Sequence, residues 1–274
     1  MRVIFSRKGF DSSAGGCPSP IIDGQPISLP IPVRTTPSPV RYVDLIGDYG
    51  SLVEDLTKGK IERHRHCHVD PDLNPSVLPR LRGWRGALGQ VGAAQSHLSN
   101  EGVSVGDLFL FWGLFRHAEQ KNRWTFYGAP EHRLFGWLQV GEILQLGEDG
   151  SFAAKRYAWL RDHPHVRHGW SRQNALYVAA EQLRINGAGF AVPGWGVFRQ
   201  GLKLTADGAN PSVWSMPDWL NPIRGGVGMT YHGDHSWSPD GTMTCASRGQ
   251  EFVADIARRT DALLWLNRLF ETVL

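Results

Sequence analysis

A loop close to the N-terminus carries the residue types that bind phosphate. Arg7 and Lys8 are followed by Asp11, Ser12 and Ser13 among glycines. Successive backbone N–H groups in such a loop can form an anion-binding nest, to which arginine, lysine and serine hydroxyls add charge and donors. The Gly-Lys-Ser/Thr ending of a P-loop is missing. We predict a substrate-binding loop with Asp11 as a catalytic carboxylate, and the alternative is a structural Asp-Ser turn.

Histidines alternate at positions 64, 66 and 68. On an extended strand they would share one face, and imidazoles at that spacing can ligate zinc or another transition metal. Arg63 and Arg65 stand between them, and their charge opposes cation binding. We therefore predict no metal site, and instead predict His68 and the nearby Asp70 as catalytic. A second group, His163, His165 and His168, raises the same question of a metal site, and we predict no metal there either.

An apolar pattern over residues 250–274 predicts a packed amphipathic helix at the C-terminus. Arg248, Gln250 and Glu251 would lie at its start. Because a helix N-terminus favours anions, Arg248 could hold a phosphate there, and Glu251 could act as a general acid or base. The alternative for Glu251 is an acid that only complements the helix dipole.

A second helix is predicted over residues 84–98. Its apolar residues recur at helical spacing: Trp84, Leu88, Val91 and Leu98. On this helix Gln95 falls inside the apolar stripe and needs a buried partner. Gln90 and His97 share another face, which could line a cleft or could face solvent.

Length and composition describe a globular, turn-rich chain. Its 274 residues are 41% hydrophobic and 20% charged, with 32 glycines and 17 prolines, which disfavours disorder and long coiled coils. We predict one large domain over residues 1–274. No apolar run reaches the roughly 18–20 residues that span a bilayer, so we expect no membrane association. Three cysteines and the absence of a signal-peptide pattern predict reduced thiols in the cytoplasm.

The order of segments predicts an α+β fold. Strands are expected at residues 2–6, 108–112 and 134–144, and a glycine-dense β region at 188–205. Residues 18–39 contain seven prolines and must be extended or turn-rich. We expect a β-rich core with the packed C-terminal helix.

Charge is unevenly distributed although the net charge is only +3. Residues 58–85 contain seven lysines and arginines against three acids. Such a patch suits a polyanion, and a solvated basic face is the alternative.

Several motifs together resemble the third family of nucleotide-modification-associated domains, whose members are linked to DNA base hypermodification. The motifs are residues 6–20, 22–24, 28–32, 68–73, 89–90, 106–111, 163–166 and 248–252. The resemblance spans nearly the whole chain. The matching polar positions are Lys8, Asp11, Ser12, Ser13, Ser19, His68, Asp70, Gln90, Arg248, Gln250 and Glu251.

A partial likeness concerns residues 105–112 and 135–143. The pattern of these strands is similar to pseudouridine-synthase-associated (PUA) and related barrels, some of which bind flipped modified bases. It implies a PUA-like barrel section at about residues 100–205 within the domain.

Together these observations predict an enzyme that modifies a base or nucleotide, in DNA more than in RNA. The loop and Arg248 would grip phosphate, and Asp11, Asp70 or Glu251 would transfer a proton or act as nucleophile. Trp84 or Trp112 would stack on an extruded base. One alternative is a non-catalytic reader of modified bases, and a weaker one is an enzyme for free nucleotides. Nucleic acid or a nucleotide is the expected partner, and no cofactor is implied.

Overall fold

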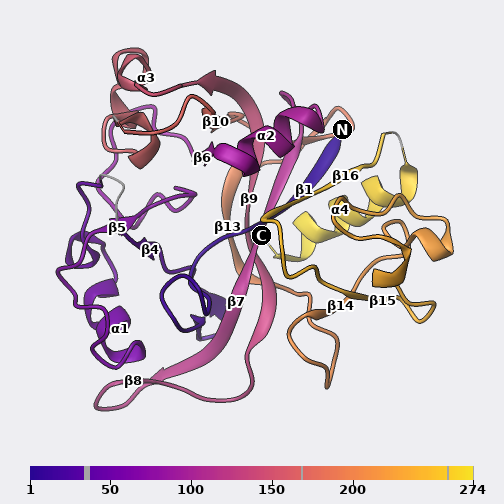
Figure 1. Ribbon diagram of the computed structural model, residues 1–274, viewed down its shortest axis with the longest axis horizontal. Coiled ribbons are helices and arrows are strands. Elements are labelled where there is room, and N and C mark those ends of the chain that lie inside the picture. Colours follow the sequence, from indigo (N-terminus) through magenta and orange to yellow (C-terminus); the bar gives the residue numbers. More distant parts are fainter. Residues whose placement is uncertain (34–37, 168, 258, 274) are drawn as a thin grey trace.

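The computed structural model describes residues 1–33, 38–167, 169–257 and 259–273 (Figure 1). One large sheet crosses the molecule in the order β16-β1-β7-β9-β10-β6, with β2 and β8 paired to β7, β3 to β2, and β13 to β9. Its strands are β1 (Arg2–Arg7), β2 (Ser19–Ile22), β3 (Gln25–Pro26), β6 (Ala87–Val91), β7 (Leu108–Gln120), β8 (Trp124–Phe126), β9 (Glu131–Gln145), β10 (Asn174–Ala179), β13 (Trp195–Lys203) and β16 (Glu251–Asp255).

Three two-stranded pairs lie outside this sheet: β4 (Ile31–Pro32) with β5 (Cys67–His68), β11 (Arg184–Ile185) with β12 (Ala188–Gly189), and β14 (Val213–Ser215) with β15 (Thr242–Thr244). The α-helices are α1 (Tyr49–Leu56), α2 (Gly92–Asn100), α3 (Ser151–Arg156) and α4 (Thr260–Val273). The 3-10 helices are η1 (Tyr42–Asp44), η2 (Ala158–Leu160), η3 (Pro164–Val166), η4 (Pro222–Arg224) and η5 (Asp234–Ser236). The α+β class is therefore confirmed.

The antiparallel pair β7 and β9 forms the spine of the sheet, and its two faces support two cores. Side chains alternate along a strand, so Leu108 and Leu110 enter one core and Phe109 and Phe111 the other. This explains why the strand is buried on both faces, as its apolar run predicts. The C-terminal helix α4 packs on the first core, where the Phe270 ring lies 5.4 Å from that of Trp137.

Two helix boundaries differ from the sequence prediction. Residues 87–91 form strand β6 and only residues 92–100 form helix α2, because the chain turns at Gly92 with a positive φ of 61°. Residues 251–255 form strand β16, which pairs with β1, and helix α4 begins at Thr260. Arg248 and Glu251 are therefore not at a helix N-terminus. Gln95 is buried as predicted, and it binds the Tyr177 hydroxyl and Ser99.

The barrel expectation is wrong for the part of the chain that the structure describes. The sheet runs from β16 to β6 without closing on itself. Cys17, Cys67 and Cys245 are free, as expected. Among the described helices, none combines the length and the apolar character needed to cross a bilayer.

Candidate functional site

A cavity of about 330 Å³ separates the N-terminal loop from strands β5 and β6. Most of its lining is polar or aromatic. These side chains are Arg7, Lys8, Asp11, Ser13, His68, Asp70, Gln90, His165, Trp170 and Gln250. Segments that are far apart in the sequence thus meet around one space, which identifies the cavity as the candidate site.

Backbone pairing places the residues of the inner wall. Strand β5 pairs with β4, which sets His68 opposite Ile31. Asp72 then exchanges two backbone hydrogen bonds with Ala87 at the start of β6. This pairing brings the carboxylate of Asp70 to Gly89, whose N–H donates to Oδ1 at 2.7 Å.

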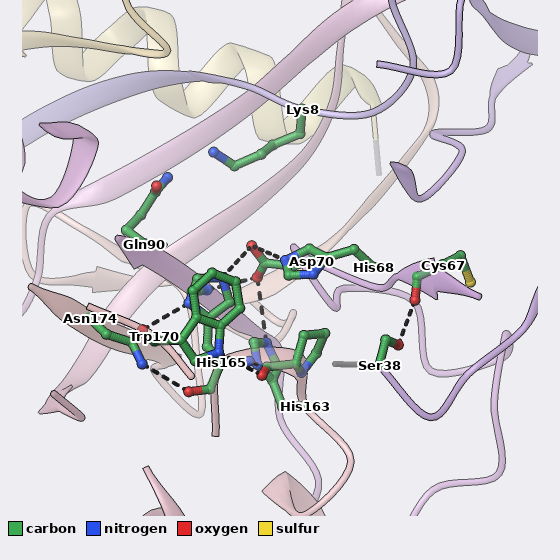
Figure 2. Close-up of polar contacts among 12 residues, drawn as sticks. Lys8, Ser38, Cys67, His68, Asp70, Gln90, His163, His165, Trp170 and Asn174 are labelled. Atoms are coloured by element: carbon green, nitrogen blue, oxygen red, sulfur yellow. Dashed lines mark hydrogen bonds and ion pairs between the residues drawn. The ribbon is translucent and has the colours of Figure 1, made fainter. Parts of the chain in front are cut away.

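Three imidazoles surround the Asp70 carboxylate, as Figure 2 shows. Nε2 of His163 lies 3.4 Å from Oδ1, and Nε2 of His165 and of His68 lie 3.8 Å and 3.9 Å from Oδ2. Both His163 and His165 come from η3 and its N-cap. Trp170 stacks on the His165 ring at 4.1 Å with an angle of 9° between the planes.

Burial and charge shift the pKa values of this cluster in defined directions. Burial lowers the pKa of the His68 imidazole to about 4, against the opposing charge of Asp70. Burial also lowers the pKa of His165. For Asp70, burial raises the pKa, but the contacts with the three histidines outweigh it and hold the pKa below its usual range. At neutral pH the cluster therefore holds a carboxylate and neutral His68 and His165 side chains.

A buried carboxylate, Glu251, lies behind the part of the cavity lining that Lys8 and Gln90 form. Its Oε1 accepts hydrogen bonds from Lys8 Nζ at 2.7 Å, Gln90 Nε2 at 2.5 Å and Ser6 Oγ at 3.1 Å. Its Oε2 is buried and has no hydrogen-bond partner among the described residues. Glu251 itself does not line the cavity, but the Lys8 and Gln90 side chains that it holds do. Figure 2 shows the Lys8 amine and the Gln90 amide pointing toward each other, above the Asp70 cluster.

In the N-terminal loop, Asp11 occupies the donors that the sequence assigns to a phosphate. Its Oδ1 accepts from the Ser13 N–H at 2.7 Å, the Ser13 hydroxyl at 2.7 Å and the Ala14 N–H at 2.8 Å. Arg7 Nε lies 3.7 Å from Oδ2 of Asp11. The loop is thus the Asp-Ser turn that the alternative describes, and its anion nest holds a carboxylate of the chain itself.

Besides Glu251, four predicted site residues lie outside the cavity. Ser12 lines a neighbouring surface hollow, and Arg248 lines another. Trp84 lies under the Arg80 guanidinium at 4.1 Å, away from the cavity. Trp112 is only 1% exposed and packs on Trp214 and Phe252, so a base cannot stack on its ring in this structure.

Four residues of the site are not among those predicted from the sequence: His163, His165, Trp170 and Asn174. The motif at 163–166 is the signal that could have found the first two, but it does not show that η3 folds against β6. Gly89 was a further signal, because a Cβ there would lie 2.1 Å from the His165 ring. His168 lies outside the described residues.

Within the described residues, one group has the donor types of a metal site. His68, Asp70 and His165 each offer one ligand atom, and these atoms all lie within 4.8 Å of one another. A second cavity of about 330 Å³ borders Asp70 from the other side, but its lining is mainly apolar, including Leu29, Leu45 and Phe135. The polar cavity is therefore the stronger candidate for an active site.

Comparison with known families agrees with the motifs. The model of nucleotide modification associated domain 3 matches residues 2–255. The chain belongs to this family. The match includes the N-terminal loop, the Asp70 cluster and Glu251, so the cavity lies within the family domain. No curated protein and no solved structure matches the chain, and the likeness to PUA barrels has no support. Membership of the family indicates a role in nucleotide modification.

Proposed function

We propose that this protein is an enzyme that modifies a nucleobase or nucleotide within nucleic acid, DNA more than RNA, and that the polar cavity is its active site. The observation that carries the proposal is the meeting of the Asp70 cluster with Lys8 and Gln90 around one space. Carboxylates and neutral imidazoles in a desolvated cavity are suited to moving protons at neutral pH.

His68 and Asp70 are the residues that we assign to proton transfer, because both line the cavity. His68 has an Nε2 beside the carboxylate and a pKa lowered by burial, so its neutral form is available as a base. Glu251 acts through Lys8 and Gln90, and is therefore a positioning residue. Asp11 lines the cavity, but its Oδ1 is engaged in the turn, which favours a structural role.

Two surface hollows that each share a lining residue with the cavity favour a polymer over a free nucleotide. One hollow, of about 970 Å³, shares Ser13 with the cavity and is lined by Lys60 and Arg65. The other, of about 690 Å³, shares Arg7 with the cavity and contains Arg248. A strand whose target nucleotide enters the cavity would place its flanking phosphates in these two hollows, where cations stabilise them.

The aromatic residue available to a base is Trp170. It lines the cavity and is partly buried, with one face stacked on His165. Trp170 thus takes the role that the sequence assigns to Trp84 or Trp112. Stacking on an aromatic ring stabilises a base without selecting its identity.

The direct test is untargeted mass spectrometry of nucleosides from the DNA and RNA of cells with and without this gene. We expect a nucleoside mass, in DNA, whose presence or absence depends on the protein. Identical nucleosides in both cell types would overturn the proposal in favour of a reader. A reader would then bind modified DNA more tightly than unmodified DNA. Activity on mononucleotides alone would instead identify the enzyme for free nucleotides.

A further inference from the structure

The two oxygens of Asp70 have different surroundings. Oδ1 accepts the Gly89 N–H at 2.7 Å and lies 3.4 Å from Nε2 of His163. Oδ2 accepts no hydrogen bond from the residues that the structure describes, and faces Nε2 of His165 at 3.8 Å and Nε2 of His68 at 3.9 Å. These distances exceed those of hydrogen bonds. One oxygen is therefore fixed by the protein, while the other points at two imidazole nitrogens across a gap.

The hydrogen bonds of Asn174 define the tautomer of His165. The Asn174 Nδ2 donates to the backbone carbonyls of Gly147 and His165, at 3.2 Å and 3.0 Å. Its Oδ1 must then accept from Nδ1 of His165, which lies 2.8 Å away. With the proton on Nδ1, the lone pair of Nε2 faces the Asp70 carboxylate. Two electron-rich groups directed at one point repel each other unless a cation lies between them.

We propose that His68 Nε2, Asp70 Oδ2 and His165 Nε2 bind one divalent transition-metal ion, of the zinc or ferrous-iron class. An ion there would use the Nε2 lone pair of His68, so in the metal-bound protein His68 and Asp70 hold the ion, and this role replaces the direct proton transfer assigned to them above. Ligands bound at about 2.0–2.2 Å lie roughly 3–4 Å apart around a common ion. Oδ2 of Asp70 lies 3.8 Å and 3.9 Å from the two imidazole nitrogens, and all three atoms lie within 4.8 Å of one another. Nitrogen ligands favour transition metals over magnesium or calcium. This inference departs from the sequence expectation of no metal, which weighed His68 together with His64 and His66.

The surroundings of the cluster have the features of a metal site. Metal-bound histidines usually donate their second ring N–H to a fixed acceptor, as His165 does to Asn174. His163 and the Gly89 N–H orient the carboxylate. Trp170 covers one face of the His165 ring, and a Cβ at Gly89 would collide with that ring, so the imidazole is tightly positioned.

Charge balance also favours a cation. Two carboxylates, Asp70 and Glu251, are buried near the inner end of the cavity, whereas Lys8 is the cation paired with Glu251 there. Among the described residues, no lysine or arginine lies at hydrogen-bond distance from the Asp70 carboxylate, whose neighbours are the three imidazoles. Three protein ligands on one wall also leave the remaining coordination positions facing the cavity, where water or substrate binds in catalytic metal sites.

The test is metal binding by the full chain, which does not require that nucleotide modification be correct. Protein purified without added metal is analysed by elemental mass spectrometry. After removal of metal with a chelator, it is titrated with Zn²⁺ by calorimetry and with Co²⁺ by visible absorption. We expect one ion per chain and Co²⁺ bands typical of nitrogen and oxygen ligands. Absence of stoichiometric binding by folded protein would overturn the proposal.

Variants then locate the ion. We expect His68→Gln and His165→Gln to weaken Zn²⁺ binding at least 100-fold, and His66→Gln, an exposed histidine two positions from His68, to leave it unchanged. Circular dichroism establishes that each variant is folded. If His165→Gln does not fold, His68→Gln carries the test alone. Binding lost equally in His66→Gln, or unchanged in folded His68→Gln, would contradict the assignment.

Discussion

At the scale of single residues, the ion pair of Lys8 and Glu251 connects the N-terminal loop to the sheet. Their side chains are 10% and 1% exposed, and Nζ lies 2.7 Å from Oε1. Ser6 and Gln90 donate to the same oxygen. Both charges are largely removed from water, so either charge without the other would lower the stability of the fold. The pair also fixes where the Lys8 and Gln90 side chains enter the cavity.

A double-mutant cycle tests this pair. Glu251→Gln leaves the Lys8 ammonium without its counter-ion, and Lys8→Met leaves the carboxylate buried alone. We expect each to lower the free energy of unfolding by about 3–5 kcal/mol. The double variant should cost clearly less than the sum, because it leaves no isolated charge. Urea unfolding followed by circular dichroism measures all four proteins, and strictly additive effects would show that the two side chains do not interact.

At the scale of elements, the contact between β9 and β14 depends on a neutral histidine. Nδ1 of His132 on β9 accepts a hydrogen bond from Nε1–H of Trp214 on β14 at 2.9 Å. Burial lowers the pKa of His132 to about 4, the Arg7 charge adds to this, and Asp11 opposes it. The unfolded chain binds this proton near pH 6.5, so the stabilisation is complete above pH 6.5 and is lost as the pH falls toward 4.

Replacing the histidine should flatten this acid loss. We expect the free energy of unfolding of His132→Gln to fall less steeply between pH 6.5 and 4 than that of the natural chain. The difference between the two curves should approach about 3 kcal/mol over that window. Subtracting the curves removes the contribution of the other buried histidines. Parallel curves would mean that His132 has the same pKa in the folded and unfolded states.

The strands and helices differ in how far the sequence alone could predict them. Strands whose signal is local, such as β1 and the centre of β7, follow from their apolar runs. The predicted helix over residues 84–98 is wrong in its first part because the apolar residues of β6 and of α2 together match a helical spacing. That spacing contains no information about the turn at Gly92, which separates the strand from the helix. The sequence pattern assigns residues 251–255 to the C-terminal helix because Phe252 and Val253 fit the helical period and the strand period alike. Their pairing with β1 shows that these residues form strand β16.

The candidate site was predictable only in part for a related reason. Lys8, His68, Asp70 and Gln90 follow from local motifs and from the family resemblance. Their approach to His165 depends on the pairing of β6 with β10 and on the fold of η3, which are contacts between distant segments. Spacing along the chain carries no information about such contacts.

At the scale of the whole molecule, the proposed path of nucleic acid crosses the cavity and the two hollows that each share a lining residue with it. Lys60 lines the larger hollow and is exposed. Lys155, in α3, is equally exposed but does not line either hollow. The fold thus provides a lysine on the path and a matched lysine away from it.

Salt dependence distinguishes the two lysines. A lysine that neutralises a phosphate releases counter-ions. Plots of log K against log salt concentration have a negative slope, and loss of the lysine makes that slope less steep by about 0.9 on a duplex and about 0.7 on a single strand. We expect Lys60→Ala to show this change in fluorescence anisotropy titrations with labelled DNA, and Lys155→Ala to show none. Equal slopes for both variants would place the DNA elsewhere.

We infer that nucleotide modification takes place in the cavity at Asp70, and that it depends on the Asp70 carboxylate. The most direct test is quantitative nucleoside mass spectrometry of DNA from cells that lack the gene and carry either Asp70→Asn or Asp72→Asn. The two residues are near neighbours in the chain, but Asp72 pairs with Arg80 and does not line the cavity. We expect the protein-dependent nucleoside to be lost with Asp70→Asn and retained with Asp72→Asn. Full modification by a stably expressed Asp70→Asn protein would contradict it.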